Sequence, residues 1–339
     1  MTRLPALDPA LLERLLTPPS GRVDVVIDTD ATNEVDDQLA IVWALLRPDI
    51  IEVKALHACP YSLEPEVLLG PGFRDESAAI RLAERTGQAL RFDPVPAQEG
   101  MRRAAAECRR LAALVGVDVP VVEGATRVMS DPDSPVESDA TASLIELAHQ
   151  DREGPLWVLG IGAATNLASA VLLDPTIREH VNIVWTSAYP TFWPLPNASF
   201  NLAQDLCASR FLFDSGVPLT YLPGYYIGEQ LGVSVPELEQ HVRGKGVVGD
   251  ALFELCMASR HLSDVPGASK VMWDLIDVAW VLDPSWLPSR LLPAPALAED
   301  LRWVDAGPGR HLMREAVRID RDALWTDFFR VLAEHAVVG

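Results

Sequence analysis

One stretch near the N-terminus constrains the fold more than any other part of the chain. Residues 25–43 read VVIDTDATNEVDDQLAIVW. The apolar run at its start has the composition of a buried strand, and the apolar residues after the acidic pair recur at helical spacing until Pro48. A buried strand, a short loop and a helix form the repeating unit of parallel α/β folds. The stretch therefore predicts a strand, an acidic loop and an amphipathic helix.

The same turn is crowded with carboxylates. Asp28 and Asp30 point to one side, because side chains alternate along a strand, and Asp36 and Asp37 open the helix, with Glu34 in the loop between. Like charges this close repel one another unless a cation neutralises them. Oxygen ligands with no His or Cys nearby suit Ca²⁺ or Mg²⁺. The pattern predicts a hard-cation site; its alternative is a capped helix with solvated loop charges.

The rest of the chain continues the alternation of strands and helices. Strands are expected at residues 51–58, 119–122, 156–161, 181–187 and 218–222. Helices are expected at residues 9–16, 77–86, 101–115, 140–149, 167–173, 203–214, 249–262 and 271–282. Residues 303–305 and 313–319 are expected to form a hairpin before a helix at 320–336. We expect one α/β domain over residues 1–339, with a mostly parallel central sheet covered by helices on both faces.

Charge and composition exclude several classes of partner. The 339 residues carry a net charge of −20, which argues against a nucleic-acid partner. No apolar segment approaches the roughly 18 residues of a membrane span, and the acid-containing N-terminus is unlike a signal peptide. The four cysteines show no metal-ligand spacing, which is typical of free thiols in a reducing compartment. We expect a cytoplasmic protein.

Three later motifs join the acidic turn. They are GAATNLA at residues 162–168, SFN at residues 199–201, and Asp274 within the helix-spaced segment VMWDLIDVAWVL. With the acidic turn, these motifs resemble the nucleoside hydrolase family over about residues 25–284. The acidic turn is two residues longer than is usual there, which resembles a poorly characterised branch. The resemblance implies a Ca²⁺-dependent enzyme, usually a homodimer or homotetramer, that hydrolyses a ribonucleoside to free base and ribose.

The resemblance also implies roles for individual residues. The residues carried over as Ca²⁺ ligands are Asp30, Asp37 and Asp274 through their side chains and Ile161 through its backbone carbonyl. Asp30 would also take the proton of the attacking water. Asp36 would hold the ribose hydroxyls, and Asn201 matches an asparagine that contacts the sugar diol.

Two positions depart from the common family pattern. Trp273 stands where many relatives place a His that protonates the leaving base. Purine-preferring relatives also have Trp there and activate the base by stacking, so Trp273 favours a purine-like leaving group, although a packing role also fits. Phe192 and Trp193 are candidates for the second face of that stack. Ser199 replaces a Glu that holds the ribose 5′-hydroxyl, so a modified substrate stays open.

Other polar residues near these motifs fit structural roles as well. His57 ends a strand near the presumed site, where a core role is favoured over an acid or a sugar contact. Asp75 and Glu76 lie in a loop that could cover the site or could start the next helix.

Four residues adjoin the expected site without being assigned to the chemistry. Asp28 matches a family acid behind the metal ligands. Thr165 and Asn166 are good helix N-caps. Asp277, one turn beyond Asp274, is either a supporting residue or a solvated helix acid.

Two rival functions remain open. DTDAT also fits the DxDxT signature of haloacid-dehalogenase-type phosphatases, with Asp28 as nucleophile, Asp30 as acid/base and Mg²⁺ as the cation. Such an enzyme needs a lysine near the phosphoryl group, and Lys54, Lys245 and Lys270 lie in no convincing motif. The other rival is a non-catalytic Ca²⁺-dependent nucleoside- or sugar-binding protein.

Overall fold

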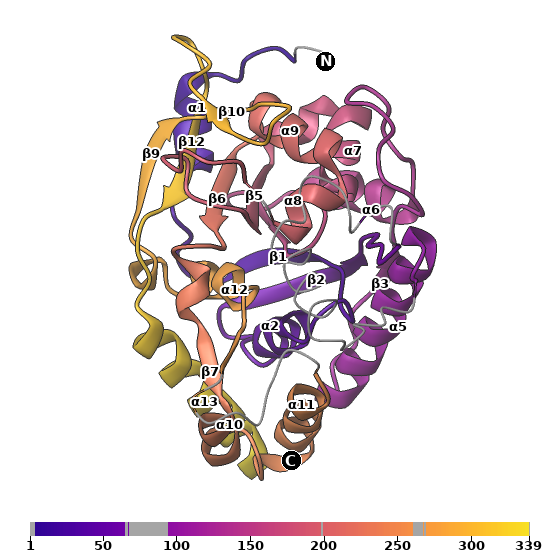
Figure 1. The fold of residues 1–339 in the computed structure, drawn as a ribbon, viewed down its shortest axis with the longest axis vertical. Coiled ribbons are helices and arrows are strands. Elements are labelled where there is room, and N and C mark those ends of the chain that lie inside the picture. The colour runs from indigo at the N-terminus through magenta and orange to yellow at the C-terminus, as the bar shows by residue number, and fades with distance from the viewer. Residues whose placement is uncertain are drawn as a thin grey trace, which may run out of the picture.

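A central eight-stranded sheet organises the structure, a computed structural model that describes residues 4–64, 67, 94–197, 199–259, 267 and 269–338 (Figure 1). The strand order is β3-β2-β1-β4-β5-β6-β12-β9, and only β9 runs antiparallel to its neighbour. Its strands are β1 (Val23–Thr29), β2 (Ile51–Ala58), β3 (Val121–Glu123), β4 (Leu156–Gly160), β5 (Val181–Ser187), β6 (Leu219–Pro223), β9 (Ser289–Pro293) and β12 (Leu312–Ala316). The expected mostly parallel sheet is confirmed. The expected helix at 77–86 and the acids Asp75 and Glu76 lie outside the described residues.

Helices cover both faces of this sheet, as the sequence predicts. The α-helices are α1 (Pro9–Leu15), α2 (Asp36–Leu45), α5 (Ala97–Val115), α6 (Asp139–Ala148), α7 (Thr165–Leu173), α8 (Phe200–Gln204), α9 (Leu206–Asp214), α10 (Val235–His241), α11 (Gly246–Ala258), α12 (Leu275–Leu282) and α13 (Arg321–Val338). Short 3₁₀ turns occur at η1 (Pro175–Glu179), η2 (Gly228–Gln230) and η3 (Pro284–Trp286). Val25 and Ile27 of β1 join the core under α2, α5 and α12, whereas Val26 joins the core under α6, α7 and α9. This alternation along one strand gives the sheet two buried faces.

The strand order reverses its direction at β1, because the strands that follow β1 in the chain lie on both sides of it. β2 pairs with one edge of β1 and β4 pairs with the other, both in parallel. Ligands of open α/β sheets bind in the crevice outside the carboxyl ends of strands at such a switch in strand order. Asp30 directly follows β1 and Ile161 directly follows β4, so both lie at this crevice.

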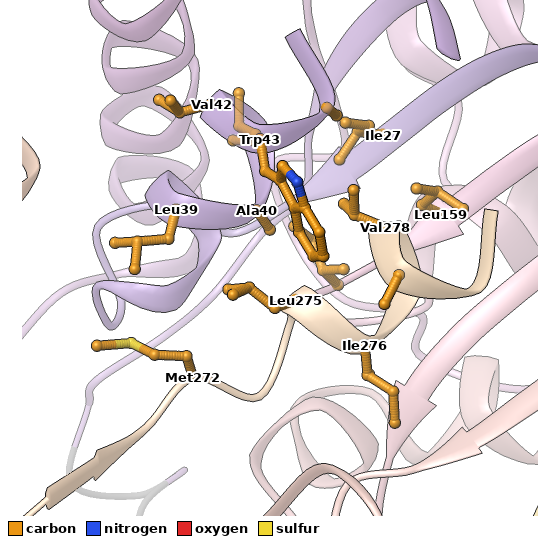
Figure 2. Close-up of a cluster of buried hydrophobic side chains, with 14 of the residues drawn as sticks. Ile27, Leu39, Ala40, Val42, Trp43, Leu159, Met272, Leu275, Ile276 and Val278 are labelled. Carbon is orange, nitrogen blue, oxygen red and sulfur yellow. The ribbon is translucent and has the colours of Figure 1, made fainter. Parts of the chain in front are cut away.

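Apolar packing between α2 and α12 places the starts of these two helices together. Figure 2 shows Trp43 of α2 lying against the α12 segment that carries Leu275 and Val278. All ten residues of α2 are buried, including its polar first turn. The expected amphipathic helix is therefore wrong, because neighbouring elements, α5 and α12 among them, cover every face of α2. Its two aspartates are held in the interior.

The C-terminal part differs from the expected hairpin. β11 (Trp303–Val304) pairs with β10 (Ala296–Leu297) in a small separate sheet, and β12 enters the main sheet. β12 lies parallel to β6 and antiparallel to β9. The antiparallel partner of β12 is therefore β9, and not the segment at residues 303–305 as expected. The segment expected as one helix at 271–282 begins in β8 (Ser269–Val271), which pairs with β7 (Gly232–Ser234), and becomes helical only at Leu275.

Two further expectations concern cysteines and membranes. All four cysteines are free thiols, as expected. Within the described residues, no helix has both the length and the apolar character needed to span a bilayer.

Candidate active site

Three buried carboxylates meet at the carboxyl end of β1. Oxygen atoms of Asp36, Asp37 and Asp274 lie within 4.8 Å of one another. Asp36 and Asp37 form the first turn of α2, and Asp274 immediately precedes α12, so the packing of these helices assembles the group. The Thr29 hydroxyl donates a hydrogen bond to Asp37 and fixes its orientation. The structure thus brings together acids that lie far apart in the sequence.

Asp30 lies beside this group rather than within it. Its carboxylate is buried and repels those of Asp36 and Asp37 electrostatically. The turn after β4 packs closely against it, because a Cβ atom at Gly162 would come within 3.1 Å of the Asp30 Cγ and 2.5 Å of the Cys59 Sγ. A side chain at Gly162 would therefore displace the Cys59 sulfur and crowd the Asp30 carboxylate. The sequence led us to expect Asp30 together with Asp37 and Asp274, whereas the three acids closest to one another are Asp36, Asp37 and Asp274.

Burial and mutual repulsion oppose ionisation of these acids. Burial raises the pKa of Asp30, Asp37 and Asp274 well above the usual range, and neighbouring carboxylates raise it further. Burial raises the pKa of Asp36 to about 6, with the Lys270 ammonium opposing that rise. The fully ionised cluster therefore needs a positive charge beside it.

The backbone carbonyl of Ile161 accepts a hydrogen bond from Asn201. The Asn201 Nδ2 donates to the Ile161 carbonyl at 3.2 Å and to the Thr186 carbonyl at 3.3 Å. Asn201 stands on α8, so α8 links the ends of β4 and β5. Two residues expected in the site therefore contact each other directly.

Lys270 is a site residue that the sequence analysis missed. Its side chain is 5% exposed, and its Nζ lies 2.5 Å from the Glu34 Oε2 and 3.7 Å from the Asp36 Oδ1. Glu34 belongs to the lengthened loop of the acidic turn. The one available signal was that loop, since an added acid in a crowded acidic turn requires a compensating cation.

Trp273 joins the acids to an aromatic row. Its backbone N–H donates to the Asp36 Oδ2 at 3.0 Å, and its half-buried indole meets the ring of Tyr225 edge-on at 5.3 Å. Tyr225 stacks on Tyr189 at 4.3 Å, and Tyr189 stacks on Trp193 at 4.5 Å. Trp193 is thus connected to Trp273 through two tyrosines that the sequence analysis did not single out. Phe192 is 62% exposed and packs against Tyr226 instead.

Ser199 makes a neutral contact. Its hydroxyl pairs with the Ser187 hydroxyl at 2.8 Å, and the residue is 9% exposed. Ser187 ends β5, so this pair closes the site on the side of that strand. No carboxylate stands at position 199 to hold a sugar hydroxyl.

The expected helix caps have other partners. Ala164 occupies the N-cap of α7, and it makes no side-chain capping bond. The Thr165 hydroxyl instead donates to Asp205, and the Asn166 Nδ2 donates to the Asp28 Oδ2, both at 2.8 Å. The capping interpretation of Thr165 and Asn166 is wrong, because these side chains turn inward to satisfy buried acids.

Asp28 supports the site from behind. It is fully buried, and burial raises its pKa to about 7, while hydrogen bonds from Asn166 and Cys59 lower it. Asn166 and Cys59 hold this carboxylate within the protein, which fits a supporting residue.

His57 and Asp277 are both core residues. His57 is buried, its Nε2 lies 3.1 Å from the Ser143 hydroxyl, and burial lowers its pKa to about 4. Asp277 is fully buried, so it is not a solvated helix acid, and burial raises its pKa well above the usual range.

The residues present fit a hard cation. The buried carboxylates and the Ile161 carbonyl supply oxygen donors only, which suit Ca²⁺ or Mg²⁺. The Asp30 Oδ2 and the Asp36 Oδ1 are buried and receive no hydrogen bond from the described residues. Buried carboxylate oxygens without donors are strongly disfavoured unless a cation or a proton satisfies them.

Comparisons of the sequence identify related proteins. A profile of the inosine-uridine preferring nucleoside hydrolase family matches residues 79–325, most of the chain, and begins after the acidic turn. A pyrimidine-specific ribonucleoside hydrolase from Escherichia coli is 30% identical over 109 residues, which cover 32% of this chain and 33% of that protein. The matches to the first such relatives cover less than half of their length.

Solved structures share the fold. A plant nucleoside hydrolase superimposes with a TM-score of 0.67 at 21% identity, covering 92% of this chain and 99% of that one. A purine-preferring ribonucleoside hydrolase from Gardnerella vaginalis superimposes with a TM-score of 0.65 at 19% identity, covering 93% of this chain and 100% of that one. The profile match over most of the chain shows that this protein belongs to the inosine-uridine preferring nucleoside hydrolase family.

Proposed function

We propose that this protein is a Ca²⁺-dependent ribonucleoside hydrolase that releases a free base and ribose, with a preference for purine-like bases. The buried carboxylate group of Asp36, Asp37 and Asp274 at the switch in strand order carries the proposal. Family membership supports ribonucleoside hydrolysis in general terms. We keep a homodimer or homotetramer and one domain over residues 1–339 as parts of the proposal.

In this proposal Asp30, Asp37, Asp274 and the Ile161 carbonyl hold the cation. A bound Ca²⁺ would supply Lewis-acid chemistry at this place. Asp30 takes the proton of that water, which its buried, hydrogen-bond-free Oδ2 is free to accept. Clustered carboxylates also favour the positive charge that develops on the sugar during N-glycosidic cleavage.

The sugar and the base are assigned to two sides of the site. Asp36 and Asn201 bind the ribose hydroxyls, and the contact of Asn201 with the Ile161 carbonyl keeps the amide beside the cation ligands. Trp273 stacks on the base. Its backbone bond to Asp36 fixes the distance between the base side and the sugar side. Holding both parts in one geometry lowers the entropic cost of reaching the transition state.

Purine preference rests on Trp273 and on the aromatic row behind it. The indole offers a wide apolar face, and Tyr225 supports its edge. The matched curated relative is named pyrimidine-specific, whereas one structural neighbour is named purine-preferring. These names point in opposite directions, so the proposal depends on the residues of this chain.

A panel of substrates tests the proposal. Inosine, adenosine, guanosine, uridine, cytidine and p-nitrophenyl riboside would each be incubated with Ca²⁺ and with EDTA, and base release followed. We expect Ca²⁺-dependent release, fastest from the purine nucleosides. Release from uridine and cytidine alone would overturn the base preference. Absence of release from every substrate would overturn the catalytic proposal.

The presence of Ser199 at the position where the family commonly has Glu favours one competing function, a Ca²⁺-dependent nucleoside-binding protein without turnover. Ser199 is engaged with Ser187 and brings no charge to the ribose 5′-hydroxyl. Calorimetry with inosine separates the two functions, since tight Ca²⁺-dependent binding without base release would support the binding protein.

A further inference from the structure

Lys270 and Glu34 form a buried ion pair next to the site. The pair joins the lengthened acidic loop to the segment before α12, and the proposed chemistry gives it no role. Lys270 and Glu34 are joined at 2.5 Å, with side-chain exposures of 5% and 20%. Burying a lysine is costly unless its charge is compensated. Two acids compensate the charge of Lys270, because its Nζ also lies 3.7 Å from the Asp36 Oδ1.

Asp36 is consequently held at both ends by one short segment. Its Oδ2 accepts the N–H of Trp273 at 3.0 Å, while its Oδ1 faces the ammonium of Lys270. Lys270 and Trp273 stand three residues apart, and Trp273 directly precedes Asp274. Asp36 itself belongs to α2, so these contacts tie the first turn of α2 to the start of α12.

The orientation of the lysine is also fixed. The Lys270 Nζ donates to the Val271 carbonyl at 2.6 Å in addition to its contact with Glu34. β8, which carries Lys270, pairs with β7 in a two-stranded antiparallel sheet. The ammonium is therefore held by the backbone of β8 and also contacts the carboxylate of Glu34.

We propose that Lys270, oriented by Glu34, is a positioning residue that holds Asp36 in the rotamer that binds the ribose hydroxyls. This inference rests on the proposed function and deepens it, by giving Glu34 of the lengthened acidic loop a purpose. Glu34 brings the counter-charge that allows a lysine to be buried against Asp36. Lys270 acts on substrate binding through Asp36 and touches neither substrate nor cation.

Kinetics of Lys270→Met with inosine test the inference. Losing the ammonium frees the Asp36 Oδ1, so we expect KM to rise at least tenfold while kcat changes less than threefold. Lys270→Arg should restore KM to within threefold of the wild type, because a guanidinium keeps the charge. Lys54→Met is the matched control, since Lys54 also pairs with acids, Glu52 at 3.1 Å and Asp24 at 4.0 Å, within β1 and β2 and away from their carboxyl ends.

Deoxynucleosides distinguish positioning from general damage. Substrates lacking the hydroxyl that Asp36 holds cannot lose that contact, so the KM penalty of Lys270→Met should fall below threefold for 2′-deoxyinosine or for 3′-deoxyinosine. Equal penalties on inosine and on both deoxynucleosides would overturn the inference. The double variant Glu34→Gln/Lys270→Met, which removes both buried charges, should show the same selective penalty if the single variant does not fold.

Ca²⁺ affinity provides a readout that is independent of turnover. Removing a positive charge near the acids cannot weaken cation binding electrostatically, so the calorimetric Kd for Ca²⁺ in Lys270→Met should stay equal or decrease. A tenfold weaker Kd would mean that Lys270 maintains the metal ligands instead. A wild-type protein without base release would refute the proposed function, whereas normal wild-type activity with an unchanged KM in Lys270→Met would refute this inference alone.

Discussion

At the scale of single residues, the site depends on buried charges that neighbouring residues force together. Asp30 lies against Gly162, where a side chain would meet the Cys59 sulfur and crowd the Asp30 carboxylate. Asp36 is held between the Trp273 backbone and Lys270. The functional groups are therefore set by close packing and by partners, not by the acids alone.

Asp30→Asn tests the assigned base. An amide cannot take up a proton from water, so we expect kcat/KM to fall by about 100-fold or more. Removing one of several repelling carboxylates should leave the melting temperature in EDTA unchanged or raised. Asp322→Asn, at an acid of α13 whose side chain is 91% exposed, is the control. Activity within threefold of the wild type would show that Asp30 is not the base.

Trp273→Ala tests base stacking. Loss of the indole face should lower kcat/KM for inosine far more than for p-nitrophenyl riboside, whose leaving group needs no protonation. The ratio of the two rates is the quantity to measure. An equal loss on both substrates would show that Trp273 serves packing alone.

Residue types were easier to predict than residue partners. The acids of the turn, Trp273 and Asn201 stand out because few other roles need those residue types in that pattern. Lys270 could not be recognised, because its partner Glu34 lies more than two hundred positions earlier in the chain. Asn166 looked like a helix cap for the same reason: its true partner, Asp28, is distant in sequence.

At the scale of elements, the contact of α2 with α12 sets the geometry of the acid group. Trp43 lies at that contact (Figure 2). Its Nε1 also donates to Asp327 of α13 at 3.1 Å. The strand and helix order of the fold followed from periodicity, since β2 and β5 have the predicted bounds. The complete burial of α2 did not follow, because it depends on which helices pack around it.

Trp43→Ala should damage both stability and the site. Deleting a fully buried indole is expected to cost about 3–5 kcal/mol of unfolding free energy. Ca²⁺ affinity should fall at least fivefold, because α2 and α12 lose their alignment. Phe211→Ala, in the core on the other face of the sheet, should cost similar stability without changing Ca²⁺ affinity. Unfolding by urea and calorimetry with Ca²⁺ measure both effects, and an unchanged affinity in Trp43→Ala would contradict this account.

At the scale of the whole molecule, the buried acids couple stability to pH and to the cation. The pKa of Asp28 is raised to about 7 and that of Asp36 to about 6. Between about pH 4 and pH 7 the folded protein therefore holds protons that the unfolded chain has released, and these groups make the unfolding free energy fall as pH rises. Buried His57, with a pKa near 4, acts in the opposite direction.

The increment in melting temperature produced by Ca²⁺ isolates the site from other titrating groups. Ca²⁺ competes with protons for the carboxylates, so its affinity and its stabilising effect should grow as pH rises from 5 to 8. Melting curves in EDTA and in Ca²⁺ at each pH give this increment. A larger increment at pH 5 than at pH 8 would contradict the coupling.

Titration of Ca²⁺ into EDTA-treated protein, with release of hypoxanthine from inosine as the readout, tests whether the buried acids form a cation-dependent catalytic centre. We predict negligible release without the cation and full recovery at about one Ca²⁺ per chain, with no recovery in Asp37→Asn. Full activity in the cation-free protein, or recovery in Asp37→Asn equal to that of the wild type, would contradict the assignment of this buried acid group as a cation-dependent catalytic centre.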